Sequence, residues 1–173
     1  MSLSSVSNTI NALGIFGRLT PELEKRFAEL EAKYSKRPKH DDANGIFSHL
    51  SLVINHDVSV GMVPVYIDLL RDLKPHLPFS ITTSDVIVKD GKHLALSFDT
   101  AQTQQIRDLA GKFFEEGVVT TYYTKVVWFV PKKNQVAAIR ELRNIREMVF
   151  SDFVLVANRQ NNENTIYSSN RYK

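Results

Sequence analysis

The chain has 173 residues, of which 43% are hydrophobic and 10% aromatic, enough for one domain with an apolar core. It contains no cysteine, which excludes disulfides and thiolate metal sites, and no apolar stretch approaches the roughly 20 residues of a membrane-spanning helix. The formal net charge of +3 and a pI near 9.1 favour an anionic ligand. We therefore expect a soluble, cytoplasmic, single-domain protein over residues 1–173, a monomer by default.

The first elements of the chain are a strand and a helix. Residues 1–10 are polar and rich in serine, so we expect them to be flexible, and a short strand is predicted from Leu13 to Leu19. Thr20-Pro21-Glu22 then indicates a helix start, because threonine is a common N-cap and proline fits the first helical turn. The helix ends at Pro38. The basic loop around its end is interpreted as a solvated connection, with a site as the alternative (Lys36, Arg37, Lys39, His40).

The segment from Phe47 to Ile54 alternates with a period of two, the mark of a strand with one packed face. One face holds Leu50, Leu52 and Ile54, and the other holds His49, Ser51 and Val53. His49 and Ser51 therefore project side by side, where an imidazole and a hydroxyl could exchange a proton and hold an anionic oxygen. A lone histidine is more often a surface or core residue, so the rest of the chain has to decide between these interpretations.

The middle of the chain alternates between helices and strands. A helix is predicted from about Val63 to Leu73. The period of two returns from Phe79 to Phe98, and Asp90-Gly91 predicts a hairpin turn within it. A further helix is predicted from Thr100 to Glu116, with Gly117 as its C-terminal cap.

The last third of the chain repeats this order. A strand is predicted from Thr121 to Val130, then a helix capped by Asn134, then strands over 153–158 and 165–168. The arginines of the helix are interpreted as a solvated basic face, with a phosphate-backbone patch as the alternative (Arg140, Arg143, Arg146). The order β-α-β-α-β-β-α-β-α-β-β falls into two similar halves, which we expect to form two lobes of one domain.

Segments along nearly the whole chain resemble the 2H phosphoesterase superfamily, which includes the bacterial 2'-5' RNA ligase-like proteins and cyclic phosphodiesterases. Gly14-Ile15-Phe16 is similar to the opening strand of that family, and His49-Leu50-Ser51-Leu52 to its first His-x-Ser/Thr motif. Leu94-Ala95-Leu96 is similar to its central strand, and Asn164-Thr165-Ile166-Tyr167 to its final strand. The resemblance implies an α+β fold, in which two pseudo-symmetric lobes of antiparallel sheet with helices on the outer faces enclose a central groove.

The resemblance also implies a symmetrical acid–base mechanism that needs no metal and no cofactor. One histidine deprotonates the attacking water or hydroxyl, the other protonates the leaving oxygen, and two Ser/Thr hydroxyls bind the phosphate. The implied substrates are 2',3'-cyclic phosphates and 2'-5' or related phosphodiesters of a nucleotide or an RNA end. His49 and Ser51 would be the catalytic residues of the first motif.

The second motif is degenerate in this chain. On the apolar frame of the strand, Lys125 occupies the histidine position and Val127 the hydroxyl position, whereas a shift of one residue would place Thr124 and Val126 there. A lysine ammonium, with a reference pKa of about 10.4, binds phosphate as a point charge but is a poor proton-transfer group. The loss of one proton-transfer partner typically lowers a rate by about 10²–10⁴.

Two more side chains are candidates for binding the substrate phosphate. His93 lies on the polar face of the predicted hairpin and could look into the groove, with a solvated hairpin tip as the alternative. Tyr123 shares the parity of Lys125 and could stack on a base or donate a proton, with packing at a sheet edge as the alternative. Trp128 has the other parity and is predicted to lie in the core.

Three hypotheses about function remain open. The first is a divergent phosphodiesterase, with His49 as acid or base, Ser51 on the phosphate and Lys125 neutralising charge. The second is a catalytically inactive module that binds a nucleotide, an RNA end or another phosphorylated ligand in the same groove, and the third is a scaffold. The retained His-x-Ser motif favours the first two, and both require His49 and Lys125 to face one shared cleft.

Overall fold

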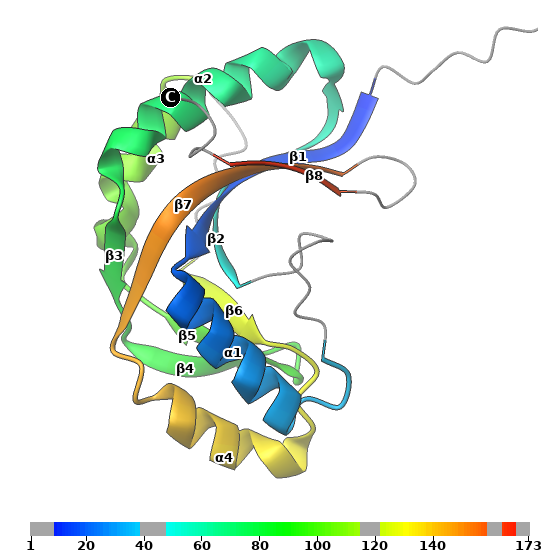
Figure 1. The fold of residues 1–173 in the computed structure, drawn as a ribbon, viewed down its shortest axis with the longest axis vertical. Coiled ribbons are helices and arrows are strands. Elements are labelled where there is room, and N and C mark those ends of the chain that lie inside the picture. The colour runs from blue at the N-terminus through cyan, green and yellow to red at the C-terminus, as the bar shows by residue number, and fades with distance from the viewer. Residues whose placement is uncertain (1–8, 39–47, 115–121, 159–163, 169–173) are drawn as a thin grey trace, which may run out of the picture.

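The computed structural model of the protein describes residues 9–38, 48–114, 122–158 and 164–168 (Figure 1). The helices are α1 (Pro21–Tyr34), α2 (Val63–Leu73), α3 (Gln104–Gly111) and α4 (Lys132–Leu142), and the short 3₁₀-helices are η1 (Val60–Met62), η2 (Lys74–His76) and η3 (Thr100–Thr103). The strands are β1 (Thr9–Leu19), β2 (His49–Ser59), β3 (Phe79–Thr82), β4 (Asp85–Lys89), β5 (His93–Ser97), β6 (Tyr123–Val127), β7 (Glu147–Asn158) and β8 (Asn164–Ser168).

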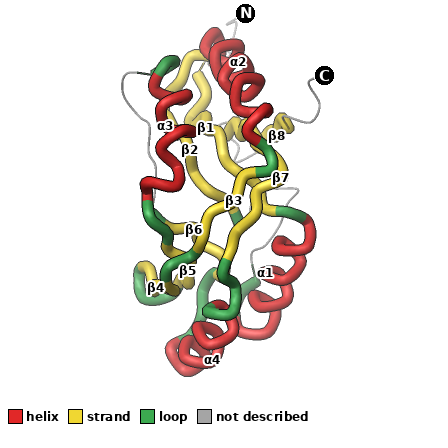
Figure 2. Tube along the Cα trace, turned by 90° about the vertical axis from the view of Figure 1, so that its left-hand side faces the viewer, coloured by secondary structure: helices red, strands yellow, loops and turns green. Residues whose placement is uncertain are grey.

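The described strands form two antiparallel sheets. The first sheet has the order β2-β1-β7-β3, with β8 pairing the second part of β7, and the second sheet has the order β4-β5-β6. Helices α2 and α3 pack on the first sheet, and α1 and α4 pack on the second (Figures 1 and 2). The predicted α+β fold, with two lobes of antiparallel sheet and helices outside them, is confirmed.

The two lobes do not correspond to the two halves of the chain. Strand β7 comes from the C-terminal half but lies between β1 and β3 in the first sheet. Helix α1 comes from the N-terminal half but packs beside α4 on the second sheet, where Lys33 forms an ion pair of 2.6 Å with Glu141 and the Tyr34 hydroxyl donates to the same carboxylate. The prediction that each half forms one lobe is therefore wrong, because each lobe takes elements from both halves.

Several element boundaries differ from the sequence prediction. Strand β1 already begins at Thr9 and buries Ile10, so these two residues are not flexible, while residues 1–8 lie outside the described part. Residues 79–89 form two strands rather than one, because the chain passes there from the first sheet to the second. Helix α3 ends at Gly111, and the predicted cap Gly117 lies outside the described residues.

Helix α4 begins two residues before the predicted cap. Its N-cap residue is Pro131, and the Asn134 side chain instead donates a hydrogen bond of 2.9 Å to the carbonyl of Tyr34. This bond joins the start of α4 to the end of α1, so Asn134 connects two helices instead of capping the start of one.

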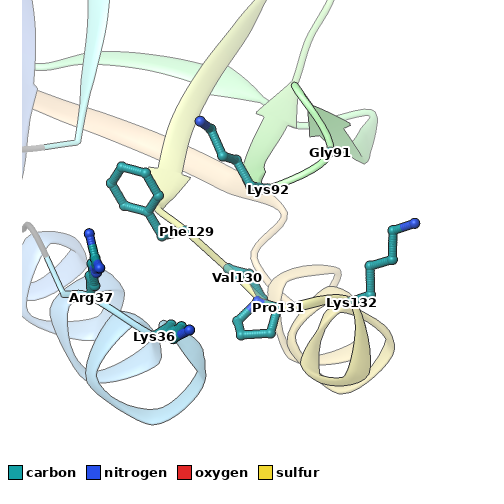
Figure 3. Close-up of a pocket in the computed structure, with 8 residues that line it drawn as sticks. All are labelled: Lys36, Arg37, Gly91, Lys92, Phe129, Val130, Pro131 and Lys132. Carbon is teal, nitrogen blue, oxygen red and sulfur yellow. The ribbon is translucent and has the colours of Figure 1, made fainter.

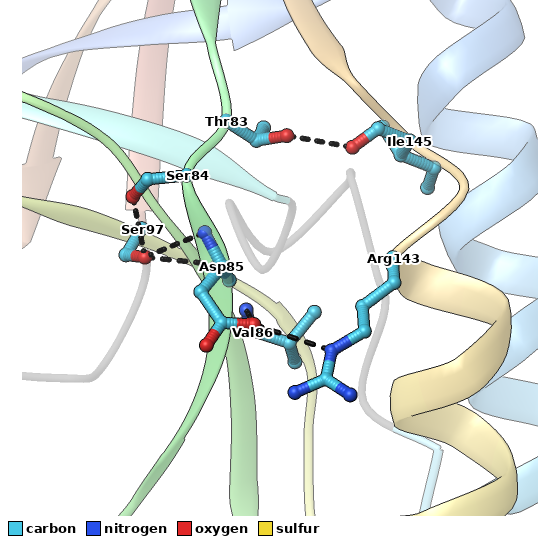
Figure 4. A network of polar contacts seen from close by, with 7 residues as sticks. All are labelled: Thr83, Ser84, Asp85, Val86, Ser97, Arg143 and Ile145. Carbon is cyan, nitrogen blue, oxygen red and sulfur yellow. Dashed lines mark hydrogen bonds and ion pairs between the residues drawn. The ribbon is translucent and has the colours of Figure 1, made fainter.

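The passage between the two sheets is held by polar contacts to the segment that follows α4 (Figure 4). The Thr83 hydroxyl donates to the Ile145 carbonyl at 2.7 Å, and Arg143 Nε lies 3.2 Å from Asp85 Oδ1. The backbone N–H of Val86 lowers the pKa of the Asp85 carboxyl most, and the hydrogen bond from Arg143 lowers it further. Arg143 therefore has a structural partner within the predicted basic face.

The two sheets meet where β2 runs beside β6. Ser48, directly before β2, is fully buried, and its hydroxyl lies 3.5 Å from the carbonyl oxygen of Val126 in β6, to which it donates. A buried carbonyl at the junction of two sheets would otherwise lack a partner from the strand ladder. Ser48 thus connects the lobes one residue away from His49.

Strand β2 keeps the predicted alternation only in its first part. Its pairing with β1 shifts by one residue after Ser51, so Leu52 is an extra residue in β2, and such a bulge moves the following side chains to the other face. Val53 is consequently buried and Ile54 half-buried, the reverse of the prediction for these two residues. The faces of His49 and Ser51 lie before the bulge and are as predicted.

Gly14 of β1 provides a test of this packing. A Cβ atom there would lie 2.8 Å from the Val53 carbonyl oxygen and 3.0 Å from the Phe16 ring, so Gly14→Ala should lower the free energy of unfolding by about 1–3 kcal/mol. Gly111→Ala is the control, since no atom lies within 4 Å of its Cβ position, and it should be neutral or raise stability by up to about 1 kcal/mol. Urea denaturation measures both changes. A Gly14→Ala protein as stable as the wild type would contradict the close approach.

Candidate functional site

A cavity of about 150 Å³ lies where the two sheets face each other. It is lined by His49 and Ser51 of β2, Tyr123 and Lys125 of β6, and Trp128, which follows β6; we call it the central cavity. All five side chains are half-buried. An imidazole, a hydroxyl and an ammonium thus line one small space, two from the first sheet and one from the second. Four of the five site residues predicted from the sequence meet there.

The first sheet orients the imidazole of His49. Phe16 and Arg18 of β1 lie opposite Ser51 and His49 of β2, so the four side chains project from the same face of the sheet. The Phe16 ring meets the His49 ring edge-on, with centroids 4.7 Å apart. The ring of Phe16 has room to lie there because Gly14 has no side chain. Phe16 is therefore a positioning residue for His49.

The row of side chains formed by His49 of β2 and Arg18 of β1 continues across the first sheet into β7. Arg18 lies opposite His49 on one side and opposite Asp152 on the other, and Asp152 is 6% exposed. A neighbouring cavity of about 370 Å³ is lined by Arg18, Leu19, Pro21, Glu24, Ser151 and Asp152. Neither Arg18 nor Asp152 is suggested by the sequence. They are found only through the register that places β7 beside β1.

In the second sheet, Lys125 and not Thr124 faces the central cavity. Thr124 is 1% exposed, and its hydroxyl has no hydrogen-bond partner within the described residues. Lys125 lies opposite Ala95 of β5 and lines the cavity. Of the two side chains that the sequence left open, the structure therefore turns Lys125 towards the cavity and buries Thr124.

A bulge follows directly and changes the next residues. Ala95 pairs with Lys125 but Leu94 pairs with Val127, so Val126 is an extra residue, and both valines are fully buried. Val127 therefore does not face the cavity as the predicted hydroxyl position would. Trp128 is turned into the cavity instead of the core, and Lys125 Nζ lies 5.5 Å from the centroid of its ring. The predictions that Val127 faces the cavity and that Trp128 lies in the core are therefore both wrong, because Val126 is an extra residue in β6.

Tyr123, the first residue of β6, lines the central cavity. Its ring packs edge-on against that of Tyr122 at 5.2 Å, and Lys89 Nζ lies 4.8 Å from its centroid. Tyr122 is 52% exposed, so an aromatic surface continues from the cavity to solvent. A base or another flat ring could stack on such a surface.

His93 has the predicted parity but does not line the central cavity. Its side chain is buried behind two aromatic rings, with centroid distances of 5.0 Å to Trp128 and 5.4 Å to Phe129. Nδ1 lies 3.4 Å from Asp90 Oδ2, and the buried Nε2 has no hydrogen-bond partner in the described part of the chain. It is therefore neither a phosphate ligand in this cavity nor a solvated hairpin tip, but a support for Trp128.

No protein-family model matches the chain, and a search of curated proteins found no match. Solved structures do match over most of the chain. Escherichia coli LigT complexed with phosphate has a TM-score of 0.56 and 15% identity, covering 94% of this chain and 95% of that one. E. coli LigT complexed with 3'-AMP has a TM-score of 0.57 and 15% identity, over 92% and 95% of the two chains. A phosphoesterase structure has a TM-score of 0.52 and 13% identity, over 91% and 95%. The chain has the LigT-like fold.

Within this LigT-like fold, two further properties concern only the described residues. They include no group of three or more histidine, cysteine, aspartate or glutamate side chains placed to hold a metal ion. No helix among them is long and apolar enough to span a membrane.

The burial of His93 predicts a pH-dependent stability. Burial lowers the pKa of His93 most, the contact with Asp90 opposes this, and Lys125 and Lys92 lower the pKa further. As the pH falls below the unfolded-state pKa of about 6.5, the unfolded chain takes up a proton that the folded chain resists, so stability falls. The stability advantage of the wild type over His93→Gln should therefore shrink between about pH 7 and pH 5.

Denaturant unfolding across this pH range measures the difference between the two proteins. His56→Gln is the matched control, because His56 is exposed in β2. A constant difference between the wild type and His93→Gln would contradict the prediction.

Proposed function

We propose that the LigT-like chain binds a phosphoryl group of a nucleotide or RNA end in the central cavity. There it would act on a 2',3'-cyclic phosphate or a 2'-5'/3'-5' phosphodiester by metal-free acid–base chemistry, slowed by the lack of a second histidine. The observation that carries this proposal is the meeting of His49, Ser51 and Lys125 at one cavity. These are a proton-transfer group, a hydroxyl and a cation at a phosphate-sized space.

The roles of the three side chains follow from their chemistry. The Ser51 hydroxyl donates to one non-bridging oxygen, and the Lys125 ammonium stabilises the negative charge on the others. When water attacks the phosphorus of a cyclic phosphate, His49 accepts the proton of the water as the bond to the leaving oxygen breaks. Ammonium groups release protons far less readily than imidazoles, so the leaving oxygen takes its proton from solvent or from the weakly acidic Tyr123 hydroxyl at the same cavity. This predicts slow turnover.

The ligands of the similar structures support a nucleotide. The matched E. coli LigT structures are complexes with phosphate, 3'-AMP, ATP and NADP⁺. In this chain Tyr123 and Trp128 place aromatic rings at the central cavity, where a base could stack beside a bound phosphate. An adenine nucleotide is therefore the first ligand to test.

A second candidate is a nucleotide-binding module without turnover. The observation that favours it is that Lys125 and Trp128 line the cavity from the side of the second sheet, and that the described lining residues include neither a second histidine nor a second serine or threonine. A cation and an aromatic ring retain phosphate and base binding but supply no second proton transfer.

Turnover without added metal separates the two candidates. With 2',3'-cyclic nucleotides and 2'-5' oligoadenylate as substrates, His49→Ala should lower kcat by about 10²–10⁴, since it removes the remaining proton-transfer group. His56→Ala, exposed in the same strand, is the control and should keep wild-type turnover. No turnover, with saturable 3'-AMP binding that Lys125→Gln weakens, would favour the binding module. If neither turnover nor binding is found, both candidates are wrong.

Restoring the second histidine tests the assigned position of Lys125. Lys125→His should raise kcat above that of Lys125→Gln by about 10² or more, because an imidazole can protonate the leaving oxygen. The pH profile of kcat should also become bell-shaped, with one limb for each histidine. Equal rates for the two variants, measured by release of the nucleotide monophosphate, would contradict the assignment.

A further inference from the structure

A third cavity, of about 360 Å³, lies at the end of β6 away from Tyr123 (Figure 3). Three separate parts of the chain form it: the end of α1, the turn between β4 and β5, and the connection from β6 to α4. We call it the basic cavity. Its lining residues are Lys36, Arg37, Gly91, Lys92, Phe129, Val130, Pro131 and Lys132.

All the charged residues that line the basic cavity are positively charged. Lys36, Arg37, Lys92 and Lys132 are exposed, none of them makes an ion pair within the described residues, and no acidic residue is among the lining residues. Four cations around one hollow repel one another, and a bound anion would relieve this repulsion. The basic loop that the sequence favoured as a solvated connection therefore contributes two cations to a cavity.

An aromatic ring projects into the basic cavity from a strained backbone. Phe129 has a φ of 52°, a conformation that residues with a side chain rarely adopt. Its carbonyl accepts a hydrogen bond of 3.2 Å from the N–H of Lys36, and the N–H of Val130 donates to the carbonyl of Lys92 at 2.7 Å. These bonds join all three parts of the cavity around Phe129. Such strain is commonly retained at ligand sites.

The ring of Phe129 lies on the side of the cavity that holds two of the cations. Lys92 Nζ is 5.3 Å from its centroid, and the ring points towards the side of the cavity where Arg37 and Lys92 project (Figure 3). An aromatic platform surrounded by cations is the usual surface on which proteins bind single-stranded nucleic acid, because bases stack on the ring while phosphates meet the cations. An acidic peptide would use the cations but not the ring.

Consecutive residues of the segment after β6 line the two cavities, Trp128 the central cavity and Phe129 the basic cavity. Phe129 follows Trp128 in the chain, and the buried His93 ring contacts both of their rings. Trp128 and Lys125 line the central cavity, so cationic and aromatic side chains continue from one cavity to the next. A single strand with its terminal phosphate in the central cavity could therefore reach the basic cavity.

We propose that the basic cavity binds an internal phosphate and a base of a single-stranded oligonucleotide whose terminal phosphoryl group lies in the central cavity. Lys36, Arg37, Lys92 and Lys132 neutralise the phosphate, and the base stacks on Phe129. This inference rests on the proposed function and narrows its ligand: the chain prefers an oligonucleotide, held also at the basic cavity, to a mononucleotide.

The first experiment compares 3'-AMP with octa-adenylate carrying a 3'-phosphate, by fluorescence anisotropy and competition over a range of salt concentrations. Octa-adenylate should bind at least about tenfold more tightly than 3'-AMP. The double variant Lys92→Gln/Lys132→Gln should weaken octa-adenylate binding about tenfold and reduce the salt slope by about 0.7 for each cation removed. Lys133→Gln is the control, since its exposed side chain is next to Lys132 but outside the cavity lining.

The second experiment removes the ring of Phe129. Asparagine tolerates a positive φ, so Phe129→Asn should remove the stacking surface without adding backbone strain, and thermal unfolding checks that the fold is kept. Octa-adenylate binding should weaken about fivefold or more, and Phe129→Tyr, which keeps a ring, should bind like the wild type.

Failure of this inference differs from failure of the proposed function. If 3'-AMP binds but octa-adenylate binds no more tightly, and the Lys92, Lys132 and Phe129 variants have no effect, the oligonucleotide site is wrong and the proposed function stands. If octa-adenylate binding depends on these residues but 3'-AMP does not bind and His49→Ala changes nothing, the basic cavity binds single strands, but the proposed function and the placement of the terminal phosphate in the central cavity are wrong. Equal competition by poly-glutamate would overturn the choice of nucleic acid.

Discussion

The buried contact between Ser48 and the Val126 carbonyl is the constraint on which the site depends. It lies where an edge strand of the first sheet runs beside an edge strand of the second, and it comes one residue before His49 and one residue after Lys125. Because the two strands run side by side at this point, the imidazole and the ammonium reach the same cavity from different sheets. Two further rings pack against the side chains that line the cavity: Phe16 contacts the imidazole of His49, and His93 contacts the ring of Trp128.

The sequence predicts the elements well and the faces of their side chains only in part. Alternation in β2 correctly places Leu50 and Leu52 in the core, and the Asp90-Gly91 turn lies where its residue types indicate, with φ of 52° and 67°. A bulge is invisible to a period-two pattern, because the extra residue is defined by the strand opposite. The prediction therefore fails for Val53 in β2 and for Trp128 after β6.

In the candidate site, too, the sequence predicts residues that are close together in the chain and misses those that only the fold brings together. His49 and Ser51 stand out because they are two residues apart on one strand, whereas Arg18 and Asp152 join that row only through the register of β1 with β2 and β7. Lys36 and Lys92 are distant in the chain, and the sequence, which leaves a site open as the alternative for the loop of Lys36, gives no reason to connect it with Lys92 until the fold places both at the basic cavity. Charge clusters assembled across elements are thus found from the structure and not from motifs.

The exchange of elements between the lobes has a mechanical consequence. The chain passes back and forth between them, through α1, through the step from β3 to β4, through α3 and through the return from α4 to β7. Two bodies joined by so many covalent connections lack the single hinge about which lobes swing apart. The central cavity should accordingly keep its width when the proposed ligand enters. Such a ligand would be selected by its shape and charge rather than by closure of the lobes around it.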